Sequence, residues 1–195
     1  MGASTLSRLP QGGGISFVGS AVLPYLEPDA ERDLRAEANA QITSLFRTVV
    51  QQYLLYRWWQ QGRCGIAAAA TPGNSNHETG RAVDLSNWAS VIGAMSAHGW
   101  AHDVPGDNVH FDHNASADLR GLDVHAFQRL WNRNHPQDVI SEDGSYGPMT
   151  EARILRSPSG GFATGACGRA TPLSAESIDW INQAALRPNL PESAD

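Results

Sequence analysis

Two histidines and an aspartate near the middle of the chain have the types and spacing of metal ligands. Residues 75–84 read Ser-Asn-His-Glu-Thr-Gly-Arg-Ala-Val-Asp, and Asp-Asn-Val-His follows at 107–110. A catalytic zinc needs three protein ligands and one open position for water, and His77, Asp84 and His110 supply such a set. Asp107, three residues before the last histidine, is spaced to act as a general base. The pattern therefore predicts one catalytic Zn²⁺ and metal-assisted hydrolysis.

The surroundings of Asp84 and His110 favour this interpretation over a structural one. Asp84 interrupts an apolar segment, where a carboxylate is costly to bury without a cation or hydrogen bonds. His110 lies between Val109 and Phe111, so in a strand it points to the opposite face from both neighbours. A strand would hold the imidazole rigidly. His102 and His113 are less informative: His102 is expected to be structural, and His113 is a candidate only for supporting a ligand.

Short apolar segments and helical patterns indicate the elements that position these residues. Strands are predicted at 41–46, 81–85 and 109–111, and helices at 29–40, 48–60 and 87–99, the last capped by Asn87. Such segments predict an α+β fold, a small antiparallel sheet with flanking helices. Residues 1–28 are rich in Gly, Ser and Pro, which indicates a loosely ordered lead-in.

The C-terminal part of the chain has a different pattern. Apolar residues at helical spacing follow Gly121, then comes a Gly-rich loop at 142–148 and a helix capped by Thr150. These features predict a small helical module. The predicted domains are the lead-in 1–28, a domain 29–120 that carries the metal-ligand pattern, the module 121–157, and a tail 158–195 of unassigned role with one short helix at 175–186.

Composition and charge limit the partners. The 195 residues are 41% hydrophobic and 17% charged, with a net charge of -6, which is typical of a globular protein without a nucleic-acid or anionic-membrane partner. No apolar segment approaches the roughly 20 residues of a membrane helix. No secretory signal is legible in the sequence. The sequence leaves open whether the two cysteines, Cys64 and Cys167, form a disulfide.

The metal-ligand pattern resembles a known peptidase group. Ser75-x-His77-x-x-Gly80-x-Ala82-x-Asp84, followed by Asp107-x-x-His110-Phe111, is similar to the zinc D-alanyl-D-alanine carboxypeptidases of VanY type, over roughly residues 42–113. The resemblance implies His77, Asp84 and His110 as zinc ligands and Asp107 as the base. It also implies that Arg47, in Phe46-Arg47-Thr48 with Gln51-Gln52 downstream, faces the scissile carbonyl, and that Ser75 binds substrate. The expected substrate is the peptide stem of peptidoglycan.

The bond that is cleaved stays open at this point. Many carboxypeptidases of this group have Glu where this chain has Asp107, and Asp resembles the phage endolysins that cleave L-alanyl-D-glutamate bonds. D-Ala-D-Ala carboxypeptidase is the main prediction and L-alanyl-D-glutamate endopeptidase the alternative. A zinc amidase that cleaves the sugar–peptide link is a further one. A non-catalytic zinc-containing wall-binding protein is disfavoured, because structural zinc usually has four protein ligands.

The C-terminal module resembles a peptidoglycan-binding repeat. The motifs are Val124-x-x-Phe127-Gln128-x-Leu130-Trp131-Asn132 and Asp143-Gly144-x-Tyr146-Gly147-Pro148-x-Thr150. The resemblance implies peptidoglycan peptide stems and glycan as partners, and a location in the periplasm, outside the cell or in the cell wall. An immunity or inhibitor protein is an expected partner if the target is a competitor's wall.

Overall fold

The computed structural model describes residues 6–37, 39–66, 68–158 and 160–162. Within them the strands and helices follow the order β1 (Ser7–Arg8), β2 (Ile15–Phe17), β3 (Tyr25–Leu26), α1 (Pro28–Arg35), β4 (Ala40–Ser44), α2 (Val49–Gln60), β5 (Ala82–Leu85), α3 (Trp88–Ala97), β6 (Trp100–Ala101), β7 (His110–His113), α4 (Leu122–Asn134) and α5 (Pro148–Ile154).

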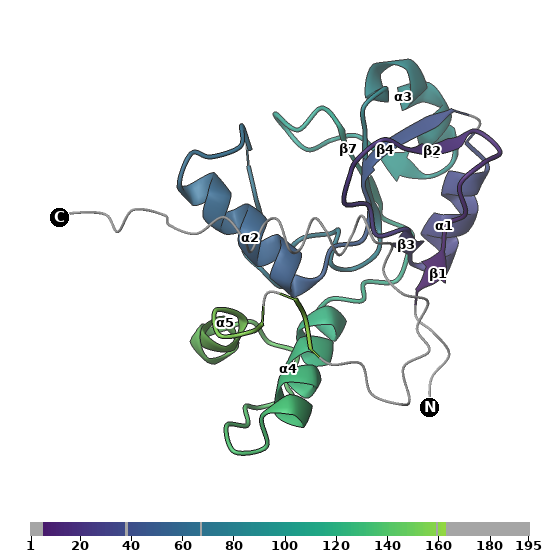
Figure 1. Ribbon diagram of the computed structural model, residues 1–195. Helices are drawn as coiled ribbons and strands as arrows, with labels where there is room; N and C mark the ends of the chain where they lie inside the picture. Colours follow the sequence, from purple (N-terminus) through teal and green to yellow (C-terminus); the bar gives the residue numbers. More distant parts are fainter. Residues whose placement is uncertain (1–5, 38, 67, 159, 163–195) are drawn as a thin grey trace.

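A five-stranded sheet in the order β2-β4-β5-β7-β6 forms the centre of the N-terminal half. Figure 1 shows α1 and α3 near this sheet, α4 and α5 at the opposite end, and α2 between the two groups. The combination of sheet and helices agrees with the predicted α+β class. The prediction of a purely antiparallel sheet is wrong at one edge, because β2 pairs with β4 in parallel. The chain between these strands contains α1, and a crossover of this kind is what a parallel pair requires.

The two faces of the sheet have different chemistry. Val83, Leu85 and Phe111 belong to the main apolar core, together with Leu34 of α1 and Met95 of α3. Because successive strand residues point to opposite faces, the intervening residues of β5 and β7 face the other way. This second face carries Asp84, His110 and Asp112, and the candidate site lies there.

The predicted loosely ordered lead-in is wrong for the described part of residues 1–28. Leu9, Leu23 and Leu26 are buried, and β2 is an edge strand of the main sheet. The strands there are only two or three residues long. They are stabilised by pairing with distant segments, so local composition gave no sign of them.

Several local predictions also need correction. α1 ends at Arg35 rather than near residue 40, and β6 was not predicted. Asn87 stands at the start of α3, but its side chain bonds the backbone beside β4, accepting from Gln41 N and donating to Asn39 O. Thr150 lies inside α5, which begins at Pro148 after Gly147.

The C-terminal helices share a core with the N-terminal half. Val49 and Tyr53 of α2 pack in one buried cluster with Val124 and Trp131 of α4 and Ile154 of α5. The module therefore packs against α2 and is not attached only through the chain at 114–120 that joins it to β7. The predicted helix at 175–186 and Cys167 lie outside the described residues, so the cysteine pairing stays untested; Cys64 is exposed.

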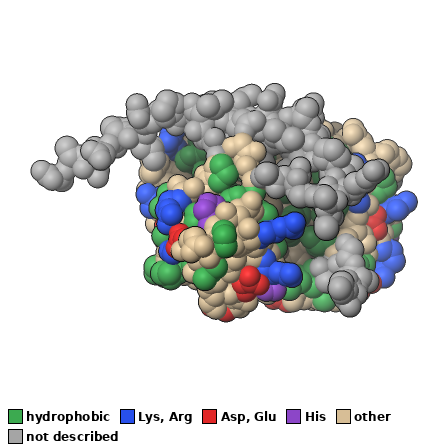
Figure 2. Space-filling model, turned by 60° about the horizontal axis from the view of Figure 1, so that its bottom comes forward, with side chains coloured by type: hydrophobic (Ala, Val, Ile, Leu, Met, Phe, Trp, Pro, Cys, Tyr) green, Lys and Arg blue, Asp and Glu red, His purple; other side chains and the backbone are tan. Residues whose placement is uncertain are grey.

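The surface shows mixed chemistry. On the face in Figure 2, outside the grey residues, basic and acidic side chains are interspersed with hydrophobic ones. Among the residues that the structure describes, no helix has the length and apolar character needed to cross a membrane.

Candidate metal centre and active site

His77 lies in the turn between α2 and β5, and a backbone carbonyl contacts one nitrogen of its ring. The ring is almost fully buried, and its Nδ1 lies 2.7 Å from the carbonyl oxygen of Leu45. A carbonyl only accepts hydrogen bonds, so Nδ1 carries the proton and Nε2 presents a lone pair. Burial, with the charge of Arg47, lowers the pKa of His77. His77 is therefore neutral and its Nε2 is available as a ligand atom.

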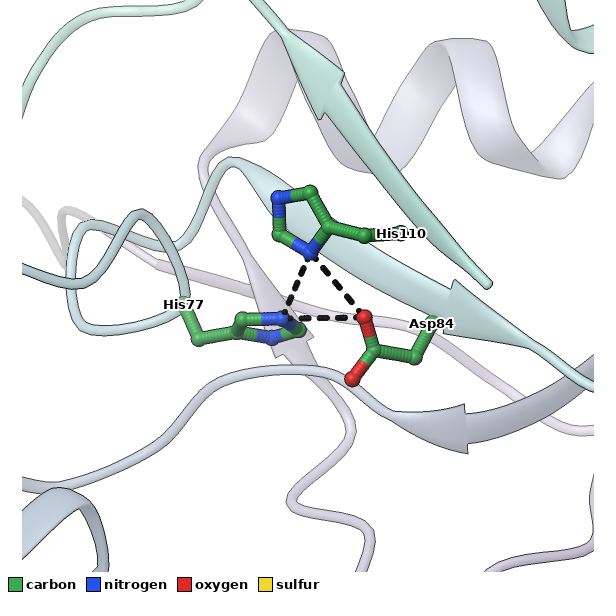
Figure 3. Close-up of side chains that lie close together, drawn as sticks. All are labelled: His77, Asp84 and His110. Atoms are coloured by element: carbon green, nitrogen blue, oxygen red, sulfur yellow. Dashed lines mark hydrogen bonds and ion pairs between the residues drawn. The ribbon is translucent and has the colours of Figure 1, made fainter. Parts of the chain in front are cut away.

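Asp84 and His110 are brought together by strand register. They are directly opposite each other in the antiparallel pair β5–β7, the position at which cross-strand side chains meet on one face. Asp84 Oδ1 lies 3.0 Å from His110 Nδ1 and 3.2 Å from His77 Nε2, and the two histidine nitrogens are 3.2 Å apart. Figure 3 shows the three side chains pointing toward a common point from the turn and the two strands.

Asp112 fixes the orientation of His110. Its Oδ1 lies 3.0 Å from His110 Nε2, and a carboxylate there accepts a hydrogen bond from Nε2–H, which leaves Nδ1 facing Asp84 and His77. Burial lowers the pKa of His110, but hydrogen bonds to Asp112 and Asp84 raise it to about 10. A metal ion bound by the three converging atoms would therefore compete with a proton for His110.

The donor set fits a tetrahedral zinc ion. With ligands at about 2.0 to 2.1 Å, neighbouring ligand atoms of a tetrahedral site are about 3.3 Å apart. The three separations observed here are 3.0 to 3.2 Å. Two imidazoles and a carboxylate are a ligand set that occurs in catalytic zinc sites. Within the described residues these three form a group capable of holding a metal ion.

Arg47 holds the remaining oxygen of Asp84. Its NH2 donates to Asp84 Oδ2 over 2.7 Å, its NH1 to Gln52 Oε1 over 3.3 Å and its Nε to Ser44 Oγ over 3.0 Å. Burial lowers the pKa of Arg47, and the charge of Asp84 opposes the shift. Three of its five N–H groups are thus occupied, and two remain for a ligand. The structure shows Arg47 in contact with Asp84. Contact between Arg47 and a substrate carbonyl stays a prediction.

A cavity of about 530 Å³ opens onto the three ligand atoms. Asp107, Arg47 and Ser75 line it together with His77, Asp84 and His110, so all six predicted site residues meet in one place. Asp107 is half-buried there. The Oγ of Ser75 accepts from the backbone N–H of His77 over 3.3 Å, which leaves its own hydroxyl proton free to donate. Apolar walls come from residues 66 and 68–70 and from Val104 and Val109.

Glu78 organises the turn that carries His77. Its carboxylate accepts from the N–H groups of Gly73 and Ser75 over 2.8 to 3.0 Å. Burial and the facing carboxyl of Asp123, at the start of α4, raise the pKa of Glu78 to about 8. Asp123 of the C-terminal module thus contacts Glu78 and helps to hold the turn that carries His77.

The structure also shows the surroundings of two further histidines whose roles the sequence left open. His113 points to the opposite face of the sheet, where it contacts Ser116 Oγ and Asp33 Oδ2, so it does not support a metal ligand. His102 stacks on Trp88, as expected of a structural residue. Sequence reasoning missed Asp112 and Glu78. The signal for Asp112 was its position two residues after His110, which puts both on one face of a strand.

Comparison with known families supports the same class of protein. Residues 28–104 match the family model VanY, described as D-alanyl-D-alanine carboxypeptidase. The match covers less than half of the chain. It includes Arg47, Ser75, His77 and Asp84 and ends before Asp107 and His110. No curated protein matches the chain. The matched segment supports a peptidase of the D-Ala-D-Ala carboxypeptidase type.

Proposed function

We propose that this chain is a zinc-dependent peptidase that hydrolyses peptide bonds in the peptidoglycan stem, with the D-Ala-D-Ala bond as its main target. The observation that carries the proposal is the convergence of His77 Nε2, Asp84 Oδ1 and His110 Nδ1 at 3.0 to 3.2 Å. The outer faces of both rings are held by acceptors, and a cavity large enough for a peptide segment opens onto the cluster.

Each residue has a distinct role in this proposal. His77, Asp84 and His110 would hold a zinc ion, which would supply a water of lowered pKa and polarise the peptide carbonyl. Asp107 accepts the proton of the attacking water and then delivers it to the leaving amine. The two uncommitted N–H groups of Arg47 stabilise negative charge that develops on the carbonyl oxygen. Ser75 donates a hydrogen bond to the substrate backbone.

An L-alanyl-D-glutamate endopeptidase is the second candidate, favoured by one residue. Asp107 has a shorter side chain than the Glu found in many carboxypeptidases of this group, and it resembles the endolysin residue. Both reactions use the same metal centre and base. They differ in which part of the stem occupies the cavity.

A non-catalytic zinc protein is disfavoured by the form of the site. Structural zinc sites usually close with four protein ligands, whereas three side chains converge here beside a carboxylate and an open cavity. A zinc amidase that cleaves the sugar–peptide link shares the same chemistry and is separated from a peptidase by its products.

Mass spectrometry of muropeptides after digestion tests the proposal. The expected result is release of terminal D-alanine by the metal-loaded protein and loss of that activity with a chelator. Separation of L-alanine from D-glutamate would establish the endopeptidase instead. His110→Ala is expected to lose both metal and activity. A metal-loaded protein that leaves every peptide bond of the stem intact would refute the proposed function.

We also propose that residues 121–157 act as a peptidoglycan-binding module and that residues 29–120 form the peptidase domain. The protein would then work in the periplasm, outside the cell or in the wall. If it acts on a competitor's wall, an immunity or inhibitor protein is an expected partner. The shared core of α2 and α4 supports a fixed orientation of module and peptidase.

A further inference from the structure

A second cavity lies beside the metal centre, between the peptidase half and the C-terminal module. It has a volume of about 710 Å³, within the range of small-molecule sites. Its walls come from the turn at 72–74, the start of α4 and the loop at 142–146. Asn74 lines this cavity and also the cavity over the metal ligands. The two cavities therefore meet at one exposed side chain.

The lining has the mixed character that suits an uncharged, hydroxyl-rich ligand. Tyr146 and Leu122 offer apolar surface, and Asn74, Ser145 and Glu142 offer hydrogen-bonding groups of both kinds. Aromatic and apolar surface beside a few placed polar groups is typical of ligand sites. The CH faces of a sugar ring can pack on the apolar surface of Tyr146 and Leu122. Its hydroxyl and acetamide groups can form hydrogen bonds with Asn74, Ser145 and Glu142.

The charges in this cavity disfavour an anionic ligand. Glu142 and Asp143 are both exposed carboxylates in the lining. The guanidinium of Arg120 is already engaged, donating to Asn76 Oδ1 over 3.0 Å and to Asp118 Oδ2 over 3.4 Å. Glu142 pairs with Arg129 over 3.6 Å, and Asp143 Oδ1 accepts from Gln128 and from the N–H of Ser145. Arg120 and these carboxylates therefore already have partners, which leaves little positive charge in the lining to bind a phosphate or free carboxylate.

The cavity is held in shape by buried contacts beneath it. The amide of Gln128, which is fully packed inside the module, donates to Asp143 Oδ1 over 2.9 Å and accepts from the N–H of Gly144 over 2.9 Å. Gly121 and Gly144 approach so closely that a Cβ on either would lie under 3 Å from the carbonyl oxygen of the other. Both have positive φ, near +85° and +70°. A ligand would thus meet a preformed site.

We infer that this cavity binds the glycan strand of peptidoglycan, and that the attached stem peptide passes Asn74 to reach the metal centre. The inference rests on the proposed function and adds a sugar subsite built jointly by the module and the turn before His77. The protein would then prefer stems still attached to glycan over free stem peptides.

Binding of chitotetraose, an uncharged sugar probe, tests the subsite without reference to catalysis. Isothermal titration is carried out on the full chain with and without zinc. Leu122→Trp fills the cavity from an exposed position and is expected to weaken binding at least tenfold. Glu142→Ala should weaken it about three- to tenfold, the change expected for one net hydrogen bond. Leu130→Trp is the matched control, because Leu130 lies on the same helix with similar exposure, 41% against 46%, and does not line the cavity.

The outcomes are separable from those of the proposed function. Sugar binding that Leu122→Trp abolishes and Leu130→Trp preserves supports the subsite even if no peptide is cleaved. Absence of chitotetraose binding, equal loss in both tryptophan variants, or binding of inorganic phosphate in place of sugar would overturn it. Where hydrolysis is found, kcat/KM should be higher for disaccharide-linked stem peptide than for free peptide, and Leu122→Trp should remove that preference. Equal values for the wild-type protein would contradict the continuous path past Asn74.

Discussion

Replacing Asp112 by alanine tests whether the hydrogen-bond partner of His110 determines the affinity of the candidate site for a metal ion. Asp112 does not face the point where the three ligand atoms converge. Its Oδ1 lies 3.0 Å from His110 Nε2, and its side chain is only 8% exposed. The truncation removes the acceptor that holds the Nε2 proton. The ring can then rotate, or place its proton on Nδ1, the atom needed by the metal.

The expected loss follows from this single contact. Removing the outer partner of a ligating histidine typically reduces metal affinity about 10- to 100-fold, equivalent to about 1.4 to 2.7 kcal/mol. Asp112→Asn retains an oxygen that can accept from Nε2 but loses the charge, so its affinity should lie between wild type and Asp112→Ala. The order of the three proteins tests orientation and charge separately.

Competition with a chromophoric zinc chelator measures the affinity. Asp33→Ala is the matched control, because Asp33 also holds a histidine: its Oδ2 lies 3.1 Å from His113 Nε2 on the opposite face of the sheet. We expect Asp33→Ala to bind zinc as the wild type does. Wild-type zinc affinity in a folded Asp112→Ala protein would refute the assignment of His110 Nδ1 as a ligand atom oriented by Asp112.

Three further predictions follow from the same structure. Asp107→Asn should keep its zinc, measured by elemental analysis, while turnover falls about 10²- to 10⁴-fold; unchanged turnover would remove Asp107 as the base. Burial and the neighbouring Asp123 raise the pKa of Glu78 from its ordinary value of 4.5 to about 8. Over that interval the folded protein keeps the Glu78 proton while the unfolded chain loses it, so this group makes the protein less stable as pH rises from 4.5 to 8. Glu78→Gln should therefore gain stability relative to the wild type across this interval in metal-free chemical unfolding, and a constant difference would contradict the shift. Gly144→Ala should lower the free energy of unfolding by at least about 1 to 2 kcal/mol, because Gly144 has a positive φ and an added Cβ would lie 2.9 Å from Gly121 O. Gly93→Ala, on α3 with open space around it, should instead raise that free energy by about 0.5 to 1 kcal/mol. Similar effects at both positions would refute the close approach of Gly144 and Gly121.

The candidate metal ligands could be selected from the sequence because their residue types are rare in such surroundings. Asp84 stands in an apolar strand, and His110 alternates with apolar neighbours. Their direct opposition in β5 and β7 could not be predicted, since register depends on how two distant segments pair. Asp112 was predictable in principle, as it shares a strand face with His110. Its neighbour His113 drew attention by residue type alone, and strand alternation places it on the wrong side.

The N-terminal segment shows where local reasoning fails. Leu9, Ile15 and Leu26 contribute to the main core, yet they are separated by Gly, Ser and Pro and follow no helical or strand period. Strands of two or three residues carry too little pattern to be recognised. Such strands are specified by the partner strand, and the partner of β2 is β4, across the whole of α1.

Helix α2 joins the two halves of the molecule more closely than a linker would. At its start, Thr48 and Gln51 form a reciprocal cap, and Gln52 holds the Arg47 guanidinium that contacts Asp84. The same helix contributes Val49 to the core shared with α4 and α5. Separating the module would expose that core and loosen the turn that positions Arg47. The C-terminal helices are therefore a structural support of the metal site as well as a candidate wall-binding surface, and the two roles cannot be assigned to independent parts.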